Sequence, residues 1–480
     1  MNRHTVEKIG GTSMNNYAAV RDNIVLQPDK EGSIYQRIIV VSAYGGITNR
    51  LLEHKKSGQP GIYSLFASSN GDDSWRKALE DLRRQLFTRN GELFEDSLSL
   101  QRANRFIDER LVSAEACLSN LQGLCQHGHF ALAEHLATVR EMLASIGEAH
   151  SAWNTVQLLQ RDGVNACFVD LTGWRGDSHM PLDTRIETAL DDIDLDTQLP
   201  VITGYAHSDT GLMASFDRGY SEMTFSRVAV LSGAREAVIH KEFHLSSADP
   251  RLVGEDKVVP IGRTNYDVAD QLANLGMEAI HPKAAKGLRQ NAIPLRVKNT
   301  FEPEHGGTLI TSDYVSDTPC VEIIAGSTGI YALELFDQDM AGQIDLHDRE
   351  IMAAIRRFRA QIIAKDINAN TITHYLSCNL KTIKRIREAL EGTYPEAEID
   401  QQKVAIVSAI GSDMQIPGIL ARTVSALAAE EISILAVHQS KRQVDMQFVI
   451  GEEDYMTAVA CLHQNLVEGM GHGRAISLAS

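Results

Sequence analysis

Short, largely apolar runs that end in small residues or glycine recur through the first three hundred residues. Residues 37–46 read as a continuous apolar strand that passes into Ser-Ala-Tyr-Gly-Gly, and residues 199–205 also end in glycine. A strand that is apolar on both faces is typical of a parallel sheet covered by helices. Further strands are expected at 6–9, 166–170, 237–240 and 293–300. Their alternation with helical segments predicts an α/β sandwich.

The helical pattern is strongest in the middle of this region. Residues 75–160 are mostly helical by pattern, because apolar residues recur at helical spacing over 98–125 and 135–143. Glu148 lies inside this stretch, where a lone glutamate is usually a solvated helix residue. Ligands in open α/β sheets bind outside the carboxyl ends of the strands, so we expect the binding residues in the turns after the strands.

A shorter repeat of strands and helices begins beyond residue 312. The order strand, helix, strand, strand, helix occurs over 330–391 and again over 404–466, and related loops at 339–342 and 413–418 follow the first strand of each copy. This pattern predicts an internal duplication of a small βαββαβ module. Such modules often pair edge to edge, which covers strands that would otherwise be exposed.

The composition is that of an ordinary globular protein, with 480 residues, 43% hydrophobic and 23% charged. No apolar run approaches the roughly eighteen residues of a membrane span, and the amino terminus lacks a signal-peptide pattern. The six cysteines are scattered without a Cys-x-x-Cys pair, which favours reduced thiols and a cytoplasmic location. A net charge of −17 disfavours nonspecific binding to nucleic acid.

The first strand leads into the turn with the most suggestive chemistry. Gly10 and Gly11 allow the backbone to approach a ligand closely, and Lys8 supplies a mobile positive charge for a phosphate. Amide groups of such a turn can bind anionic oxygens. From spacing alone, an ordinary turn and a phosphate site are equally compatible with this stretch, which lacks the pattern of a Walker A loop.

A second candidate lies at residues 216–222, before a helix that runs through Ser232. Arg218 and Ser221 could bind a carboxylate or phosphate, because arginine offers paired donors to planar anions. Alternatively, Ser221 is simply the residue that caps this helix.

Taken in order, these motifs resemble the aspartate kinase family. Lys-Ile-Gly-Gly-Thr-Ser from Lys8 is similar to its signature Lys-Phe-Gly-Gly-Thr-Ser. The other matching motifs, in chain order, are Val40-Val41-Ser42-Ala43, Gly147-Glu148, Arg218-Gly219-x-Ser221, Asp249-Pro250-Arg251, Ile280-His281-Pro282, Val297-Lys298-Asn299-Thr300-Phe301 and Gly307-Thr308-Leu309-Ile310. The resemblance covers essentially the whole chain. It implies an amino-acid-kinase-type three-layer α/β/α sandwich over 1–312, followed by a tandem of ACT domains at 313–400 and 401–480. An alternative is that the carboxyl-terminal residues return to the first ACT domain.

The resemblance implies ATP-dependent phosphorylation of the L-aspartate β-carboxylate to 4-phospho-L-aspartate, with Mg²⁺. It places Lys8 and the amides of Gly10 and Gly11 at the phosphates, with Ser42 beside them, and assigns Arg251 to the nucleotide. The residues implied at the aspartate end are Thr12, Ser13, Glu148, Arg218, Ser221 and Glu222. Arg218 would bind a carboxylate of the substrate with help from Ser221, and Glu148 would bind its ammonium group.

The sequence departs from the family pattern at two places in the site. Residues 217–222 read Asp-Arg-Gly-Tyr-Ser-Glu in place of Gly-Arg-Gly-Gly-Ser-Asp. In the nucleotide loop at 240–251 only the closing Asp-Pro-Arg survives, and Glu278 stands where a lysine is usual. The adenine contacts therefore differ from those of the family and cannot be named beyond Arg251. These changes resemble the subgroup of aspartate kinases encoded with ectoine biosynthesis genes.

In the family, the ACT pair commonly binds lysine or threonine as a feedback inhibitor. The corresponding positions here are Asp339 and Met340 in one loop, and Asp413 and Met414 in the other. Because Ser-Lys-Arg at 440–442 replaces the usual Ser-Ser run, we expect an altered or lost response to these effectors. The resemblance also implies a homodimer or higher homo-oligomer that forms through the ACT domains.

Two other functions stay open at this point. The chain could be an amino-acid kinase of the same fold that acts on glutamate, acetylglutamate or a carbamate, although the ACT tandem argues against this. It could also be a catalytically weak regulatory or ligand-binding protein, as the rewritten nucleotide loop suggests. Retention of Lys8, Ser42, Glu148 and Arg218 favours an active aspartate kinase.

Overall fold

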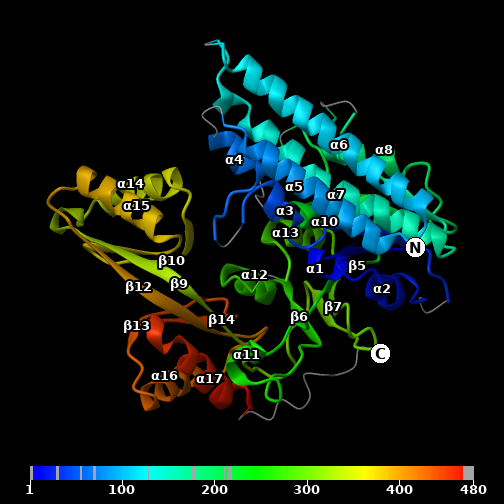
Figure 1. The fold of residues 1–480 in the computed structure, drawn as a ribbon. Helices are drawn as coiled ribbons and strands as arrows, with labels where there is room; N and C mark the ends of the chain where they lie inside the picture. Colours follow the sequence, from blue (N-terminus) through cyan, green and yellow to red (C-terminus); the bar gives the residue numbers. More distant parts are fainter. Residues whose placement is uncertain are drawn as a thin grey trace. The chain divides into compact units, whose positions relative to one another are not determined.

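The chain forms two compact units in a computed structural model that describes residues 4–28, 32–54, 57–68, 72–127, 129–175, 180–209, 211–213, 219–277 and 279–468. The first unit comprises Met1–His244 and Ile280–Ser312, and the second comprises Leu245–Ala279 and Asp313–Ser480. Figure 1 shows the elements of each unit along the chain. From the sequence we expect a boundary at residue 312, which assigns Leu245–Ala279 to the catalytic domain. In the structure this segment packs with the second unit.

The first unit is built on a mainly parallel sheet in which β1 is central. Its strands follow the order β3-β4-β2-β1-β5-β7-β8, and β8 alone among these runs antiparallel to its neighbour. Their bounds are β1 Thr5–Ile9, β2 Arg37–Val41, β3 Ala166–Val169, β4 Leu199–Thr203, β5 Glu236–Lys241, β7 Leu295–Asn299 and β8 Thr308–Thr311. β1, β2 and β4 are buried at every position, as strands covered on both faces require.

Helices cover both faces of this sheet, which confirms the predicted three-layer sandwich. On one face α10 packs against β1, β2 and β5 and is flanked by α8 and α13. On the other face α7 packs against β2, β3 and β4, and the long helices α6 and α5 lie behind it (Figure 1). The helices of this unit are α1 Gly11–Met14, α2 Tyr17–Val20, the π-helical η1 Arg21–Val25, α3 Ile47–Leu51, α4 Ile62–Ser68, α5 Ser74–Leu93, α6 Ser97–Leu124, η2 Leu132–Glu134, α7 Leu136–Arg161, α8 Leu182–Leu190, α10 Tyr220–Ser232 and α13 Pro282–Gln290.

The second unit holds one antiparallel sheet of six strands in the order β10-β11-β9-β12-β14-β13. Its strands are β9 Ile323–Phe336, β10 Gln361–Ile367, β11 Thr371–Ser377, β12 Glu398–Ile410, β13 Ile434–Gln439 and β14 Asp445–Gly451. Its other elements are α11 Pro250–Val253, β6 Arg263–Asn265, α12 Tyr266–Asn274, η3 Gln338–Met340, α14 Ile344–Arg357, α15 Leu380–Thr393, α16 Ile419–Ala429, η4 Glu452–Asp454 and α17 Tyr455–Leu466. The predicted pair of modules is present, and β9 and β12 run through both of them.

β9 and β12 are longer than their apolar patterns predicted. The first part of β9, Ile323–Ser327, pairs with Ile406–Ile410 of β12 and supplies the fourth strand of the second module. The remainder of β9 belongs to the first module, where it pairs with β11. Residues 469–480, to which the alternative of a return to the first module applies, lie outside the described residues.

Helix α12 explains why residues 245–279 belong to the second unit. Its apolar residues Val268 and Leu272 are fully buried in one core with Ile323, Ile406 and Val449 of the sheet. Burial of such side chains contributes about 1.5–3 kcal/mol each, so this helix is a structural part of the second unit. Within the described parts of both units, no helix is long and apolar enough to cross a membrane.

Candidate active site

The candidate site lies at the carboxyl ends of β1, β2 and β4, where the parallel sheet places three turns side by side. The N–H of Ser42 donates to the carbonyl of Ile9 at 3.1 Å, and the N–H of Gly204 donates to that of Val41 at 2.9 Å. These bonds continue the strand pairing by one residue, which fixes the turns relative to each other. Residues that are far apart in sequence therefore meet at this edge.

Glu148 of α7 is the most deeply buried acid of this group, with 2% of its surface exposed. Its Oε1 accepts a hydrogen bond from the Ser221 hydroxyl at 3.1 Å, and that hydroxyl lies 3.5 Å from the hydroxyl of Ser42. Its Oε2 is buried and has no hydrogen-bond partner among the described residues. Burial raises the pKa of Glu148 to about 8, against the opposing effects of the Ser221 hydroxyl and the charge of Lys8.

Lys8 forms an ion pair with Glu222, the third residue of α10. The Lys8 Nζ lies 3.5 Å from Glu222 Oε1, and the N–H of His281 donates to Glu222 Oε2 at 2.6 Å. Burial alone would raise the pKa of Glu222, but the charges of Lys8 and Lys241 and the His281 amide lower it overall. Glu222 is therefore ionised, whereas Glu148 is largely protonated at neutral pH.

The glycine turn is packed tightly against the second turn. A Cβ atom on Gly11 would lie only 2.7 Å from the carbonyl oxygen of Ala43, so this position excludes any side chain. The N–H of Gly10 already donates to the carbonyl of His240 at 3.1 Å, which leaves the amide of Gly11 as the candidate for a phosphate. Ser13 is buried, with its hydroxyl 2.9 Å from that of Thr300, whereas Thr12 is exposed.

A buried charged cluster on the opposite face of β1 supports this turn. The Nε and Nη2 of Arg37 donate to the two carboxylate oxygens of Glu7, at 2.6 and 2.8 Å. The Nε2 of His240 lies 2.7 Å from the same carboxylate, and the Thr5 hydroxyl donates to it at 2.9 Å. Although burial opposes it, the pKa of Glu7 stays well below its usual value because of Arg37 and His240.

A second buried network lies behind the Ser42 turn, and the sequence reasoning did not identify it. The Ser151 hydroxyl donates to the carbonyl of Ser42 at 2.8 Å. Nearby, His150 Nε2 lies 2.7 Å from Asn90 Oδ1, and Asn154 donates to the same oxygen at 2.9 Å. Burial lowers the pKa of His150 to about 3, so the ring is neutral. The available signal was the spacing of four residues between His150 and Asn154, which places both on one face of α7.

The described residues of this edge do not include every predicted one. Arg218 and its neighbour Asp217 fall outside the described residues, as does Glu278. Arg251 belongs to the second unit, where its exposed guanidinium binds the carboxylate of Asp249 at 2.7 Å.

The two predicted effector loops also differ from expectation in one respect. Met340 and Met414 are buried in the hydrophobic cores of the second unit, so their side chains are not presented to a ligand. Asp339 is exposed and Asp413 is half-buried. These two aspartates are the members of the predicted effector set that a small molecule can reach in this structure.

Comparison with known proteins agrees with this architecture. Residues 3–299 match the model of the amino acid kinase family, and residues 407–466 match an ACT domain. The chain is 55% identical over 476 residues to aspartate kinase Ask_Ect of Stutzerimonas stutzeri (strain A1501), covering 99% of this chain and 100% of the relative. Aspartokinase 1, chloroplastic, of Arabidopsis thaliana is 23% identical over 491 residues, which cover 96% of this chain and 80% of the relative.

Solved structures show the same fold at low sequence identity. Aspartokinase III of E. coli in complex with aspartate and ADP has a TM-score of 0.70 at 20% identity, covering 96% of this chain and 99% of that chain. The same enzyme in complex with lysine and aspartate has a TM-score of 0.71 at 19% identity, with coverage of 97% and 100%.

We expect Gly11→Ala to destabilise the first unit, because the new Cβ would press against the backbone oxygen of Ala43 at 2.7 Å. The loss in the free energy of unfolding should be about 1–3 kcal/mol, as for other overpacked sites. Urea denaturation followed by circular dichroism measures this change. Gly91→Ala in α5 is the matched control, because no atom lies within 4 Å of its added Cβ. This control should be stabilising by about 0.5–1 kcal/mol, and equal effects of the two changes would contradict the proposed packing.

The raised pKa of Glu148 makes stability depend on pH. Because this pKa is about 8 in the folded chain against a usual 4.5, the folded chain binds the proton more tightly than the unfolded chain. The resulting contribution to stability is complete below pH 4.5 and is lost as the pH rises to about 8. Over this range Glu148→Gln should lose less stability than the parent, as measured by urea denaturation at a series of pH values. Glu109→Gln, at an exposed position of α6, should keep the slope of the parent. Parallel curves for the parent and Glu148→Gln would show that the carboxyl is not protonated.

Proposed function

This chain belongs to the amino acid kinase family and, within it, to the ectoine-associated aspartate kinases, and we propose how its residues transfer a phosphoryl group from ATP to L-aspartate. The observation that carries the proposal is the convergence of Lys8, Ser42, Glu148, Ser221 and Glu222 at one edge of the sheet. Among the described residues, this edge brings together the ammonium group of Lys8, the ionised carboxylate of Glu222 and the protonated carboxyl of Glu148, each held by a different element. Such a site can bind a phosphate and an amino acid together.

Lys8 serves the phosphate end of the site. In the reaction, an oxygen of the aspartate β-carboxylate attacks the γ-phosphorus, the bond to the β,γ-bridging oxygen breaks, and ADP leaves. The protein contributes mainly by positioning the reactants and neutralising charge. Lys8 is held by Glu222 in a buried position, so its ammonium group needs little reorganisation to meet the transferring group. The amide of Gly11 and the hydroxyl of Ser42 are assigned to the phosphate oxygens.

Glu148 and Ser221 serve the aspartate end. The buried Oε2 of Glu148 has no partner in the described part of the site, and an ammonium group of the substrate would supply one. The positive charge of that ammonium would lower the pKa of Glu148, so the carboxyl would ionise as the substrate binds. In this scheme Arg218 binds a carboxylate of the substrate, and Thr12 has a supporting role. Glu222 is assigned instead to Lys8, since its carboxylate is already engaged there.

Mg²⁺ fits this site as a companion of the nucleotide. Among the described residues no group of three or more histidine, cysteine, aspartate or glutamate side chains could hold a metal ion. Magnesium in kinases is usually bound by one or two carboxylates and by the substrate phosphates. We therefore propose that the ion would be held chiefly by phosphate oxygens, since both carboxylate oxygens of Glu222 are already engaged by Lys8 and the His281 amide. When bound, it would neutralise charge on the phosphates. A nucleotide contact from Arg251 is still a prediction.

Lys8→Ala should reduce kcat for aspartate by about two to three orders of magnitude, because the electrostatic stabilisation of the transferring group is lost. A coupled assay of ADP release with ATP and L-aspartate, L-glutamate or N-acetyl-L-glutamate measures this change. Lys77→Ala, at an exposed position of α5, is the control and should leave kcat unchanged. Absence of turnover with aspartate would overturn the assignment, and preferred turnover of glutamate or acetylglutamate would favour a different acceptor.

We also propose that the chain forms a homodimer through its ACT modules and responds weakly, or not at all, to lysine and threonine. The burial of Met340 and Met414 and the Ser-Lys-Arg run at 440–442 support the second part. Steady-state assays should show full activity in the presence of millimolar L-lysine or L-threonine. Inhibition by either amino acid in this range would contradict the proposal.

A further inference from the structure

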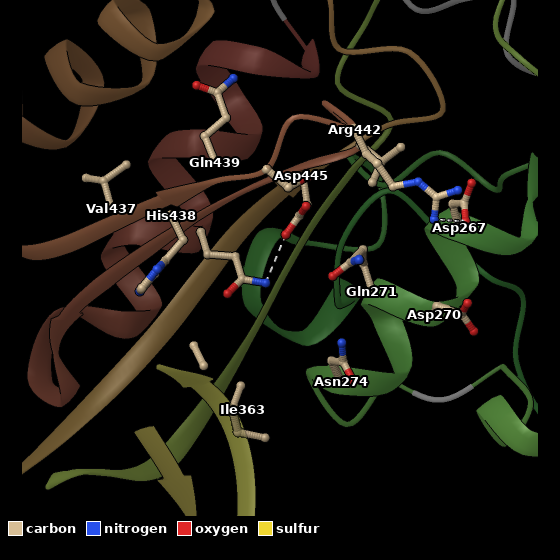
Figure 2. Close-up of a pocket in the computed structure, with 14 residues that line it drawn as sticks. Asp267, Asp270, Gln271, Asn274, Ile363, Val437, His438, Gln439, Arg442 and Asp445 are labelled. Atoms are coloured by element: carbon tan, nitrogen blue, oxygen red, sulfur yellow. Dashed lines mark hydrogen bonds and ion pairs between the residues drawn. The ribbon is translucent and has the colours of Figure 1, made fainter. Parts of the chain in front are cut away.

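The second unit contains a polar cavity of 610 Å³ that the proposed reaction does not use. Its walls come from α12, from β10, and from β13 and β14 with the turn that joins them (Figure 2). All of these elements belong to the second unit. The volume falls within the range of about 300–1,000 Å³ that is typical of small-molecule sites.

One wall of the cavity is a polar stripe along α12. Asp267, Asp270, Gln271 and Asn274 line the cavity at the spacing i, i+3, i+4, i+7, which places them on one face of the helix. Figure 2 shows these four side chains along the same helix. The apolar residues of α12 pack instead on the middle of the sheet. The helix therefore presents carboxylate and amide groups to the cavity, whose lining residues all belong to the second unit.

The facing wall contains a carboxyl and an amide that are almost fully buried. Asp445 and Gln447 occupy alternate positions of β14, are 7% and 8% exposed, and are joined by a 2.9 Å hydrogen bond (Figure 2). Burial raises the pKa of Asp445. His438 pairs with Gln447 in the strand register and lines the same cavity. Its Nε2 is buried and has no hydrogen-bond partner among the described residues.

The charges of the cavity favour a cation. Three aspartates line it, whereas the arginine that lines it, Arg442, is 68% exposed at its side chain and pairs with Asp267 at 3.1 Å. Ile363, Ala364 and Val444 supply an apolar surface beside these polar groups. A ligand that fits both surfaces has a protonated nitrogen and a short aliphatic part.

We propose that this cavity binds a small aliphatic molecule that carries a protonated amine, with its ammonium group between Asp445 and the polar stripe of α12. The amide groups of Gln271, Asn274 and Gln447 accept or donate the remaining hydrogen bonds. The methylene groups of the ligand contact Ile363 and Ala364. This site is separate from the phosphoryl-transfer residues, which belong to the first unit.

Isothermal titration calorimetry of the full-length protein with 1,4-diaminobutane tests the proposal. We expect saturable binding of the diamine and no binding of butane-1,4-diol, which has the same chain length and no charge. L-Lysine is a second arm, and its tighter binding would identify the ligand as an amino acid of the same chemical class. Asp445→Asn and, on the facing wall, Asp270→Asn should each weaken binding by about tenfold or more, as expected for loss of a charged hydrogen-bond acceptor.

Two further variants locate the binding. Asp400→Asn, at an exposed position of β12, controls for loss of charge in the same unit and should bind as the parent does. Glu148→Gln should also leave binding of the diamine unchanged, because Glu148 lies in the first unit. Unaltered thermal unfolding would show that the cavity variants fold. The proposal is overturned if neither amine binds, if the diol binds equally, if both cavity variants bind normally, or if Glu148→Gln abolishes binding.

Discussion

A lysine on the central strand of a buried parallel sheet places an ammonium group away from most of the solvent, so the fold must supply an anion beside it, and this requirement organises the catalytic unit. Lys8 is supplied with Glu222, which is 214 residues away in the sequence and lies at the start of α10. Glu222 in turn needs a second donor, which the backbone of His281 provides. The first strand, α10 and the segment that leads into α13 are thus tied together by one carboxylate.

The same strand carries a second charge on its other face, where Glu7 is neutralised by Arg37 and approached by His240. Removing one partner from such a buried pair leaves an uncompensated charge, which is far more damaging than loss of a surface pair. β1 therefore connects the charged groups of both faces to a single backbone. These pairs hold β1 in place, and the close approach of the following turn to Ala43 depends on the position of β1.

Two glutamates of the site show how the surroundings of a carboxyl group determine its protonation and its role. Glu222 lies near two lysines and an amide donor, which lower its pKa, so it is ionised. At Glu148 burial has the largest effect and raises the pKa to about 8, so this carboxyl holds its proton at neutral pH. Groups whose pKa values are pushed apart in this way mark different roles in one site. Glu222 fixes the cation that meets the phosphate. Glu148 can ionise to bind a positive charge, because an ammonium group that arrives beside it would lower its raised pKa.

The sequence predicted the sandwich, the paired modules and the convergence of Lys8, Ser42, Glu148 and Ser221, because strand ends and glycine turns have strong local signals. It did not predict the network around His150, since buried polar residues on a helix look like a solvated face until their surroundings are known. It also placed Glu222 at the aspartate end of the site, because the pairing of Glu222 with Lys8 depends on how α10 crosses β1. The length of β9 was missed for a similar reason, since its first part is defined by pairing with β12 and not by its own apolar pattern.

Helix α12 shows most clearly what a local pattern leaves undecided. The apolar stripe of this helix is a local pattern, but the sheet that buries the stripe lies in a part of the chain that begins more than forty residues later. That packing turns the neighbouring polar stripe toward the cavity, with Asn274 at its end still exposed. The chain then passes from Asn274, at the end of α12, to His281, the donor to Glu222, within seven residues. One short connection therefore joins a wall of the cavity to a residue that holds the phosphate-binding pair in place.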